Sequence, residues 1–250
     1  MNETLHELLA SLRLKGIDRV LDEELHRAEK EGTSATEVLF RLCKEERAYR
    51  QNQSLLWRLQ GAKIPWDWTL KTFPFEKQPG VNKTQINALA GLDFIERGEN
   101  IVFVGNAGTG KSGLAAGILR EALLSGYRGR FYNAQDLMDE LYASLADRSS
   151  AKLMKHLCRF DLLLIDELGY LSLKAEQVNA FFKLMEERYT RKRSTILTTN
   201  LTYPEWYDLF QRKNLVDALL DRLNHHCITI HINGPSLRVP TNGKRKGDKA

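Results

Sequence analysis

The sequence has little cysteine and no long apolar run. Its three cysteines, Cys43, Cys158 and Cys227, lie far apart and lack the paired spacing of a zinc site. We therefore expect neither a disulfide nor a structural zinc ion, and we interpret all three as core residues. No apolar stretch approaches the roughly 18–20 residues that span a bilayer, and the first residues do not resemble a signal peptide. These features predict a cytoplasmic protein without a membrane partner.

Acidic residues are also outnumbered, because Lys and Arg total 37 against 32 Asp and Glu. This modest excess favours a polyanionic partner but is weak evidence by itself. Part of it lies in residues 240–250, which we expect to form a disordered basic tail. The tail is either a solubilising end or an arm that contacts phosphates.

The first quarter of the chain differs in pattern from the rest. Apolar residues recur there at helical spacing, which predicts a small all-α domain over residues 1–68. We expect this domain to bind DNA or a partner. Gly16 and the run Gly32-Thr33-Ser34 punctuate it, so three helices are expected, the last capped ahead of Ala35. Residues 69–98 are the linker into a nucleotide domain. The aromatic group in and before this linker is expected to pack at the domain junction rather than to stack on bases; it comprises Trp66, Trp68, Phe73 and Phe75.

Residues 99–239 alternate short apolar runs with longer helical patterns. The expected strands are Ile101–Val104, Gly129–Tyr132, Leu162–Ile165, Thr195–Thr198 and Cys227–Ile232. The expected helices are Gly113–Leu124, Ala134–Leu145, Ala175–Thr190, and segments around Tyr203–Phe210 and Leu215–Leu223. Five strands separated by helices predict an α/β fold with a five-stranded parallel sheet between helices.

A phosphate-binding motif follows the first of these strands. Its residues, Gly105-Asn106-Ala107-Gly108-Thr109-Gly110-Lys111-Ser112, fit G-x-x-x-x-G-K-[ST] between a strand and a helix that continues at Gly113. The glycines let backbone N–H groups face phosphate oxygens, and the helix adds its positive dipole end. Lys111 is the predicted cation on the β- and γ-phosphates, and the Ser112 hydroxyl is a predicted Mg²⁺ ligand.

Two carboxylates follow the buried strand that ends at Ile165. Asp166 is predicted to hold Mg²⁺, and Glu167 to polarise the water that attacks the γ-phosphate. This pair favours hydrolysis of ATP, since no base-reading loop typical of GTPases is found. A kinase that acts on a small molecule stays open as an alternative.

The order of these motifs resembles an AAA+ ATPase. In that class the residue that ends the next strand, here Asn200, contacts the γ-phosphate and the attacking water, although Asn200 also suits a helix cap. Arg222 resembles the arginine that reaches a neighbouring subunit's nucleotide; the alternative is an ordinary surface ion pair. Most AAA+ modules continue into a helical lid, but only 18 residues follow Ile232, so no C-terminal lid domain is expected. Arg238 either replaces the lid's γ-phosphate contact or lies in an edge segment.

Within the AAA+ class the chain resembles the IstB family, the ATPase helpers of certain bacterial insertion sequences. The resemblance rests on Gly105–Ser112, Leu163–Gly169 with Tyr170-Leu171, Thr198–Leu201, Glu205-Trp206, Asp221–His226 and Gly234–Arg238. It implies binding of duplex DNA, self-association into a ring or helical oligomer, and stimulation of a partner transposase. DnaC and DnaI helicase loaders share the same catalytic elements and form the alternative reading.

Two basic clusters are candidate DNA contacts. Lys44, Arg47 and Arg50 lie at helical spacing in the first domain, and Arg191-Lys192-Arg193 precede the fourth strand. Either cluster could instead be a solvated face. The chain lacks the three separated carboxylates of a transposase metal site, so strand transfer is assigned to the partner.

Overall fold

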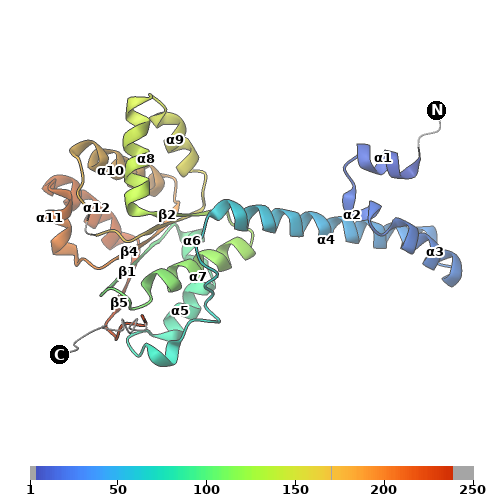
Figure 1. Ribbon diagram of the computed structural model, residues 1–250, viewed down its shortest axis with the longest axis horizontal. Helices are drawn as coiled ribbons and strands as arrows, with labels where there is room; N and C mark the ends of the chain where they lie inside the picture. The colour runs from blue at the N-terminus through green and yellow to red at the C-terminus, as the bar shows by residue number, and fades with distance from the viewer. Residues whose placement is uncertain (1–3, 170, 239–250) are drawn as a thin grey trace, which may run out of the picture. The chain divides into compact units, whose positions relative to one another are not determined.

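The computed structural model describes residues 4–169 and 171–238, so Tyr170 and the predicted tail, residues 240–250, lie outside the described residues. The chain forms two compact units, Met1–Gln60 and Gly61–Ala250 (Figure 1). The predicted boundary after residue 68 is therefore corrected. Residues 61–68 belong to the second unit because Arg120 donates to the carbonyls of Trp66 and Trp68, and the Trp66 ring meets Phe131 edge to face at 5.5 Å.

The first unit contains four helices within its described residues, where three were expected. They are α1 (Leu5–Ser11), α2 (Lys15–Asp18), α3 (Leu21–Glu31) and α4 (Ala35–Ala62), the last of which continues past the boundary. Leu9, Leu21 and Leu42 form the small core of this unit. Such a core buries little apolar surface, so polar contacts matter more for this unit than for the second.

Gly16 lies inside α2 instead of separating two helices. A Cβ at this position would lie 2.6 Å from the Cα of Glu46 on α4, so the glycine permits close contact between the two helices. The buried Glu46 carboxylate accepts hydrogen bonds from the backbone N–H groups of Gly16 and Ile17, at 2.6 and 3.2 Å. Gly16 is therefore required by packing rather than by a turn.

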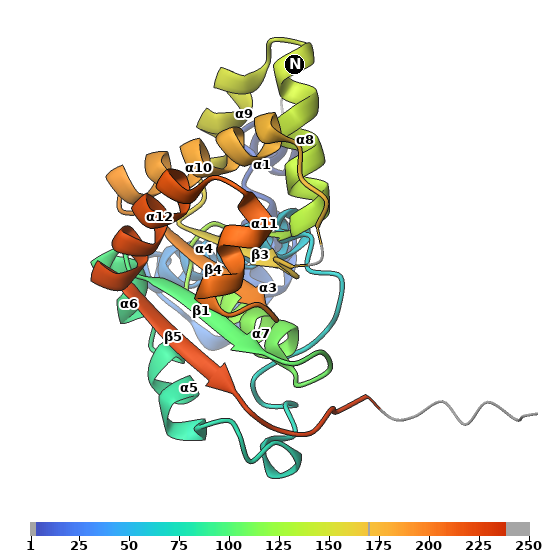
Figure 2. The ribbon, with the colours of Figure 1, turned by 90° about the vertical axis from the view of Figure 1, so that its left-hand side faces the viewer.

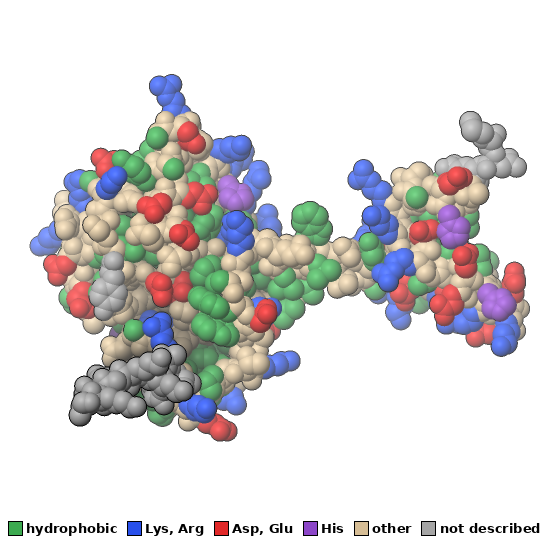
Figure 3. Space-filling view, in the orientation of Figure 1, with side chains coloured by type: hydrophobic (Ala, Val, Ile, Leu, Met, Phe, Trp, Pro, Cys, Tyr) green, Lys and Arg blue, Asp and Glu red, His purple; other side chains and the backbone are tan. Residues whose placement is uncertain are grey.

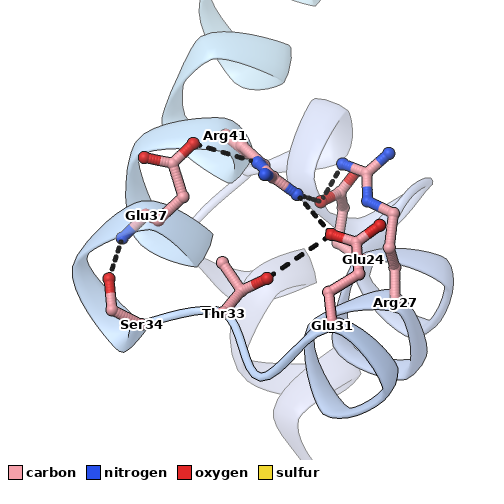
Figure 4. Close-up of polar contacts among 7 residues, drawn as sticks. All are labelled: Glu24, Arg27, Glu31, Thr33, Ser34, Glu37 and Arg41. Atoms are coloured by element: carbon pink, nitrogen blue, oxygen red, sulfur yellow. Dashed lines mark hydrogen bonds and ion pairs between the residues drawn. The ribbon is translucent and has the colours of Figure 1, made fainter.

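Arg41 of α4 links this helix to α3 by pairing with acidic side chains (Figure 4). The Arg41 guanidinium lies 3.5 Å from the Glu31 carboxylate of α3 and 3.1 Å from that of Glu37 on its own helix. Ser34 accepts a hydrogen bond from the Glu37 N–H, which is the predicted cap of α4.

The second unit is built on a parallel sheet with strand order β2-β3-β4-β1-β5. The strands are β1 (Asn100–Gly105), β2 (Gly129–Asn133), β3 (Leu162–Asp166), β4 (Ser194–Thr199) and β5 (Cys227–Ile232). All five predicted strands are confirmed within a residue of their bounds. The three central strands, β3, β4 and β1, bring their carboxyl ends side by side.

Helices cover both faces of the sheet (Figure 2). One face carries α7 (Lys111–Leu124), with α5 (Lys83–Ala90) beside it and α6 (Asp93–Arg97) before β1. The other carries α8 (Ala134–Ala146), α9 (Ser150–Leu157), α10 (Ala175–Thr190), α11 (Trp206–Phe210) and α12 (Lys213–His225), with the short 3-10 turns η1 (Phe75–Lys77) and η2 (Tyr203–Glu205) in connections. Helices α5, α6 and α9 were not predicted. Within the described residues no helix follows β5.

Two further expectations concern burial. Cys158 is buried and Cys227 half-buried, but Cys43 is exposed, which corrects its interpretation as a core residue. Its neighbour Leu42 faces the core, and successive residues of a helix point about 100° apart. None of the helices in the described part of the chain is both long and apolar enough to cross a membrane.

Candidate functional site

The phosphate-binding loop turns between β1 and α7 through two glycines. Gly108 and Gly110 have φ angles of 81° and 93°, a left-handed backbone conformation that residues with a Cβ rarely adopt. The side chain of Thr109 donates to the carbonyl of Asn106 at 2.9 Å, which closes the loop on itself. Its sequence therefore produces the local shape that the motif predicts.

Lys111 points its ammonium group back into this loop. The Nζ atom donates to the carbonyl oxygens of Gly105 and Asn106, both at 2.7 Å, and the side chain is only 9% exposed. Burial lowers the pKa of Lys111; the charges of Asp166 and Glu167 oppose this shift, and Arg238 adds to it. Because its hydrogen bonds in the described part of the chain go to backbone carbonyls, this buried cation retains the capacity to bind an anion.

The carboxyl ends of β3 and β4 are joined through one hydroxyl. Thr198 donates its hydroxyl proton to Asp166 and accepts the backbone N–H of Glu167 at 2.9 Å. Burial raises the pKa of Asp166, while its hydrogen bonds with Thr198 and Ser112 act in the opposite direction. Ser112 and Asp166 thus share a contact and offer a hydroxyl and a carboxylate, the hard oxygen donors that suit Mg²⁺.

Glu167 is exposed and held in a defined position. Its φ angle of 62° turns the chain sharply at the end of β3. The Asn133 side chain, from the end of β2, donates to the Glu167 carboxylate at 3.2 Å. Sequence reasoning missed Asn133, because an asparagine before a helix is most simply read as a cap, and Asn133 does also cap α8.

A cavity of about 740 Å³ brings these residues together. From the predicted site it is lined by Ala107, Gly108, Gly110, Lys111, Ser112, Gly113, Glu167, Asn200 and Arg238. The side-chain oxygen of Asn200 lies so close to Gly169 that an added Cβ there would be 2.3 Å away. Asp166 is only 1% exposed and reaches the same place through its contact with Ser112.

Trp68, directly before the linker, and Phe73 within it line this cavity as well. A Cβ at Gly113 would lie 3.2 Å from the Trp68 ring, and one at Gly110 would lie 2.7 Å from the Phe73 ring. The two rings therefore contact the start of α7 and the phosphate-binding loop. The prediction of junction packing did not assign either ring to the site.

Arg222 lies on α12, away from the cavity lining. Its guanidinium donates to the Ala218 carbonyl at 3.1 Å and to the exposed Glu186 carboxylate at 3.3 Å. Within one chain it therefore forms the ordinary ion pair that was the alternative reading.

The predicted basic clusters are partly engaged in ion pairs. Arg50 pairs with Glu46, Arg191 with Glu187, and Arg193 with Asp161. On the face shown in Figure 3, Lys and Arg side chains are dispersed among acidic ones over the surface. Because Arg193 directly precedes β4 whereas Asn200 follows it, the second cluster lies at the opposite end of the sheet from the cavity.

The fold and this site define a AAA+ P-loop ATPase. The family model described as IstB-like ATP binding protein matches residues 7–245, and the chain belongs to this family. It is therefore an ATP-binding ATPase.

Individual relatives agree with this assignment. A protein of Pseudomonas aeruginosa described as an ATP-binding protein of insertion sequence IS21 is 33% identical, over 94% of this chain and 88% of its own length. A Bacillus thuringiensis subsp. berliner protein described in the same way for IS232 is 34% identical over 96% of both chains. Among solved structures, the DnaC helicase loader superposes with a TM-score of 0.58 and 25% identity, over 69% of this chain and all of that one.

Proposed function

We propose that this ATPase binds duplex DNA when loaded with Mg²⁺ and ATP, self-associates on it as a ring or helical oligomer, and stimulates a partner transposase. The observation that carries the proposal is the cavity, which brings together a buried lysine, a carboxylate and an amide in a chain whose relatives are described as ATP-binding proteins of insertion sequences. A cavity of this size suits a nucleotide.

The chemistry follows from the contacts of each side chain. Lys111 exchanges its backbone carbonyls for the β- and γ-phosphate oxygens, and Ser112 and Asp166 hold Mg²⁺. When bound, the ion neutralises charge on the phosphates. Glu167 polarises the attacking water, and Asn200 donates its amide to the γ-phosphate and that water.

Asn133 controls when Glu167 is available. Its hydrogen bond to the carboxylate competes with the bond that Glu167 makes to water. We assign this bond to the resting state, with release of Glu167 on DNA binding.

The apolar part of the cavity suits the purine base. Trp68, Phe73 and Leu237 line it beside the phosphate-binding loop. A stacked base gains about 1–3 kcal/mol on an aromatic platform.

Arg222 acts on the neighbouring subunit's nucleotide in the oligomer. Its ion pair with Glu186 is weak, because the Glu186 side chain is 60% exposed. Arg222 can therefore leave Glu186 for the neighbouring subunit's γ-phosphate at a small cost in free energy. Hydrolysis then depends on assembly, because Arg222 acts on the nucleotide of another subunit.

The ion pairs of the two basic clusters favour some of the proposed DNA contacts over others. In the described part of the chain, Lys44 and Arg47 are exposed and have no acidic partner within ion-pair distance, unlike Arg50, Arg191 and Arg193. We propose Lys44, Arg47 and Lys192 as the stronger phosphate contacts. Their loss should reduce the dependence of binding on salt.

Size-resolved binding to labelled duplex DNA tests the proposal. The protein is measured with ATP, with ADP and as Lys111→Ala, with Lys152→Ala as a matched control because Lys152 is an exposed residue of α9 outside the cavity lining. We expect large complexes with ATP in the wild type and control, and none with ADP or Lys111→Ala. No duplex binding at low salt would contradict the proposal.

A helicase-loading function is the second candidate, and the superposition on the DnaC helicase loader favours it. It predicts preference for single-stranded DNA and binding of a hexameric helicase through residues 1–60. The same experiment with single-stranded DNA and a purified replicative helicase distinguishes the two functions.

A further inference from the structure

The segment after β5 lies against the phosphate-binding loop. We refer to Asn233–Arg238 as the C-terminal strap. The Leu237 N–H donates to the Gly108 carbonyl at 2.8 Å, and Leu237 and Arg238 both line the cavity. A Cβ at Gly108 would lie 2.2 Å from the Ser236 hydroxyl, so the loop and the strap are in direct contact.

Gln78 connects this strap to the loop from a third segment, between η1 and α5. Its side chain is fully buried. The Nε2 atom donates to the carbonyl of Thr109 in the loop at 3.0 Å and to that of Pro235 in the strap at 2.9 Å. One carboxamide thus binds segments that lie 126 residues apart in sequence, from Thr109 to Pro235 (235 − 109 = 126).

The carboxamide oxygen of Gln78 indicates which part of the side chain matters. Its Oε1 atom is buried without a hydrogen-bond partner in the described part of the chain, which is unfavourable for folding. It lies against Gly234, where a Cβ would be only 1.5 Å away. An apolar side chain would avoid the unpaired oxygen, so the distinctive contribution of Gln78 is its pair of N–H donors.

We infer that Gln78 is a positioning residue that holds the C-terminal strap on the phosphate-binding loop and so keeps Arg238 over the bound nucleotide. The inference rests on the proposed nucleotide site and on the first of the two expectations from the sequence for Arg238, that it contacts the γ-phosphate. Gln78 itself does not line the cavity; it acts through the strap. The electrostatic influence of Arg238 on Lys111 agrees with this placement.

The consequence is a specific effect on nucleotide discrimination. Arg238 over the γ-phosphate strengthens ATP binding relative to ADP, so a displaced strap lowers the ratio of ATP to ADP affinity. Loss of fold stability alone would weaken both nucleotides equally. The ratio therefore separates a positioning role from a merely structural one.

The test compares four full-length proteins by titration calorimetry with ATP and with ADP: wild type, Arg238→Ala, Gln78→Met and the double variant. Methionine keeps the length of glutamine and removes both donors. A charged hydrogen bond corresponds to roughly a 10- to 150-fold change in affinity. We expect Arg238→Ala to lower the ATP-to-ADP ratio within this range, Gln78→Met to lower it at least threefold, and the double variant to match Arg238→Ala.

Gly234→Ala provides an independent variant, because its methyl group would occupy the place of the Gln78 Oε1 atom without altering the glutamine. It should lower the ratio as Gln78→Met does. A lowered ratio in Arg238→Ala with an unchanged ratio in Gln78→Met and Gly234→Ala overturns the positioning role alone. An unchanged ratio of ATP to ADP affinity in Arg238→Ala would show instead that Arg238 does not contact the γ-phosphate, which is the contact on which the inference rests.

Discussion

The two ends of the parallel sheet both bury charged side chains, but they differ in how those charges are satisfied. At the amino end, Arg188 of α10 is 1% exposed and its guanidinium donates to the Thr195 hydroxyl and to the carbonyls of Leu157, Phe160 and Ser194. Burial lowers its pKa to about 9. Every side of this cation is occupied by protein.

At the carboxyl end the buried charges lie at or beside a cavity, which Lys111 lines. Among the described residues, the Lys111 ammonium group donates to carbonyls of its own loop, and Asp166 bonds to the hydroxyls of Thr198 and Ser112. Burial shifts pKa values at both ends of the sheet, so a perturbed pKa alone does not distinguish a structural charge from a functional one. The cavity beside the charges at the carboxyl end does distinguish them.

The largest expected effect tests the catalytic reading of the carboxyl end. Glu167→Gln keeps the shape of the side chain and removes its basicity, so kcat for ATP hydrolysis should fall roughly 10²- to 10⁴-fold. ATP affinity and Tm should stay near the wild-type values. Phosphate release and titration calorimetry measure these quantities, and a variant that retains a tenth of the activity would contradict the assignment.

The matching change at the amino end should affect folding instead. Arg188→Met leaves buried carbonyls without donors, so the free energy of unfolding should fall by about 3–5 kcal/mol. The folded fraction should still bind ATP. Arg191→Met is the control, because its ion pair with Glu187 is exposed and contributes under about 1 kcal/mol. Denaturant unfolding gives both values; equal effects of the two substitutions would contradict the comparison.

A smaller effect on ATP hydrolysis is expected at Asn133, which in our proposal holds Glu167 in the resting state. Asn133→Ala removes the hydrogen bond to Glu167, so ATP hydrolysis without DNA should rise about two- to tenfold. Stimulation by DNA should shrink by the same factor. If hydrolysis without DNA decreases, Asn133 supports catalysis rather than restraining it.

The smallest expected effect concerns Asp166. Because burial raises its pKa above the ordinary 3.8, the folded protein holds a proton on this group at pH values where the unfolded chain has lost it. The contribution of this group to stability is therefore present at low pH and is lost as pH rises through the folded-state pKa.

Asp166→Asn should accordingly stabilise the protein without nucleotide at neutral pH by about 1 kcal/mol, or about 2–4 °C in Tm. Calorimetric unfolding at several pH values measures this difference, which should shrink on acidification. A lower Tm at neutral pH would show that the carboxylate is better compensated than its burial suggests.

The sequence predicts much of the second unit because its signals are local. Apolar runs give the strands, and the glycine pattern before Lys111 gives the turn that follows β1. Asn133 and Gln78 carry no such pattern, and their roles arise only when β2 lies beside β3 and the C-terminal strap returns to the loop. The role of Trp68 was equally hard to predict, since its contact with Gly113 joins the segment before the linker to a helix far along the chain.

The first unit shows a different limit. Gly16 suggests a break between helices by composition, whereas its position in α2 is required by contact with Glu46. Such a requirement depends on the packing of two helices and is absent from the local sequence.

The most direct test of the account is titration calorimetry of the protein with Mg²⁺ and ATP, comparing wild type, Lys111→Ala and the surface control Lys152→Ala. If the cavity at the carboxyl end is the nucleotide site, wild type and control bind one ATP per chain, and Lys111→Ala binds roughly 10- to 150-fold more weakly. Equal ATP affinity in all three proteins would show that the nucleotide binds elsewhere.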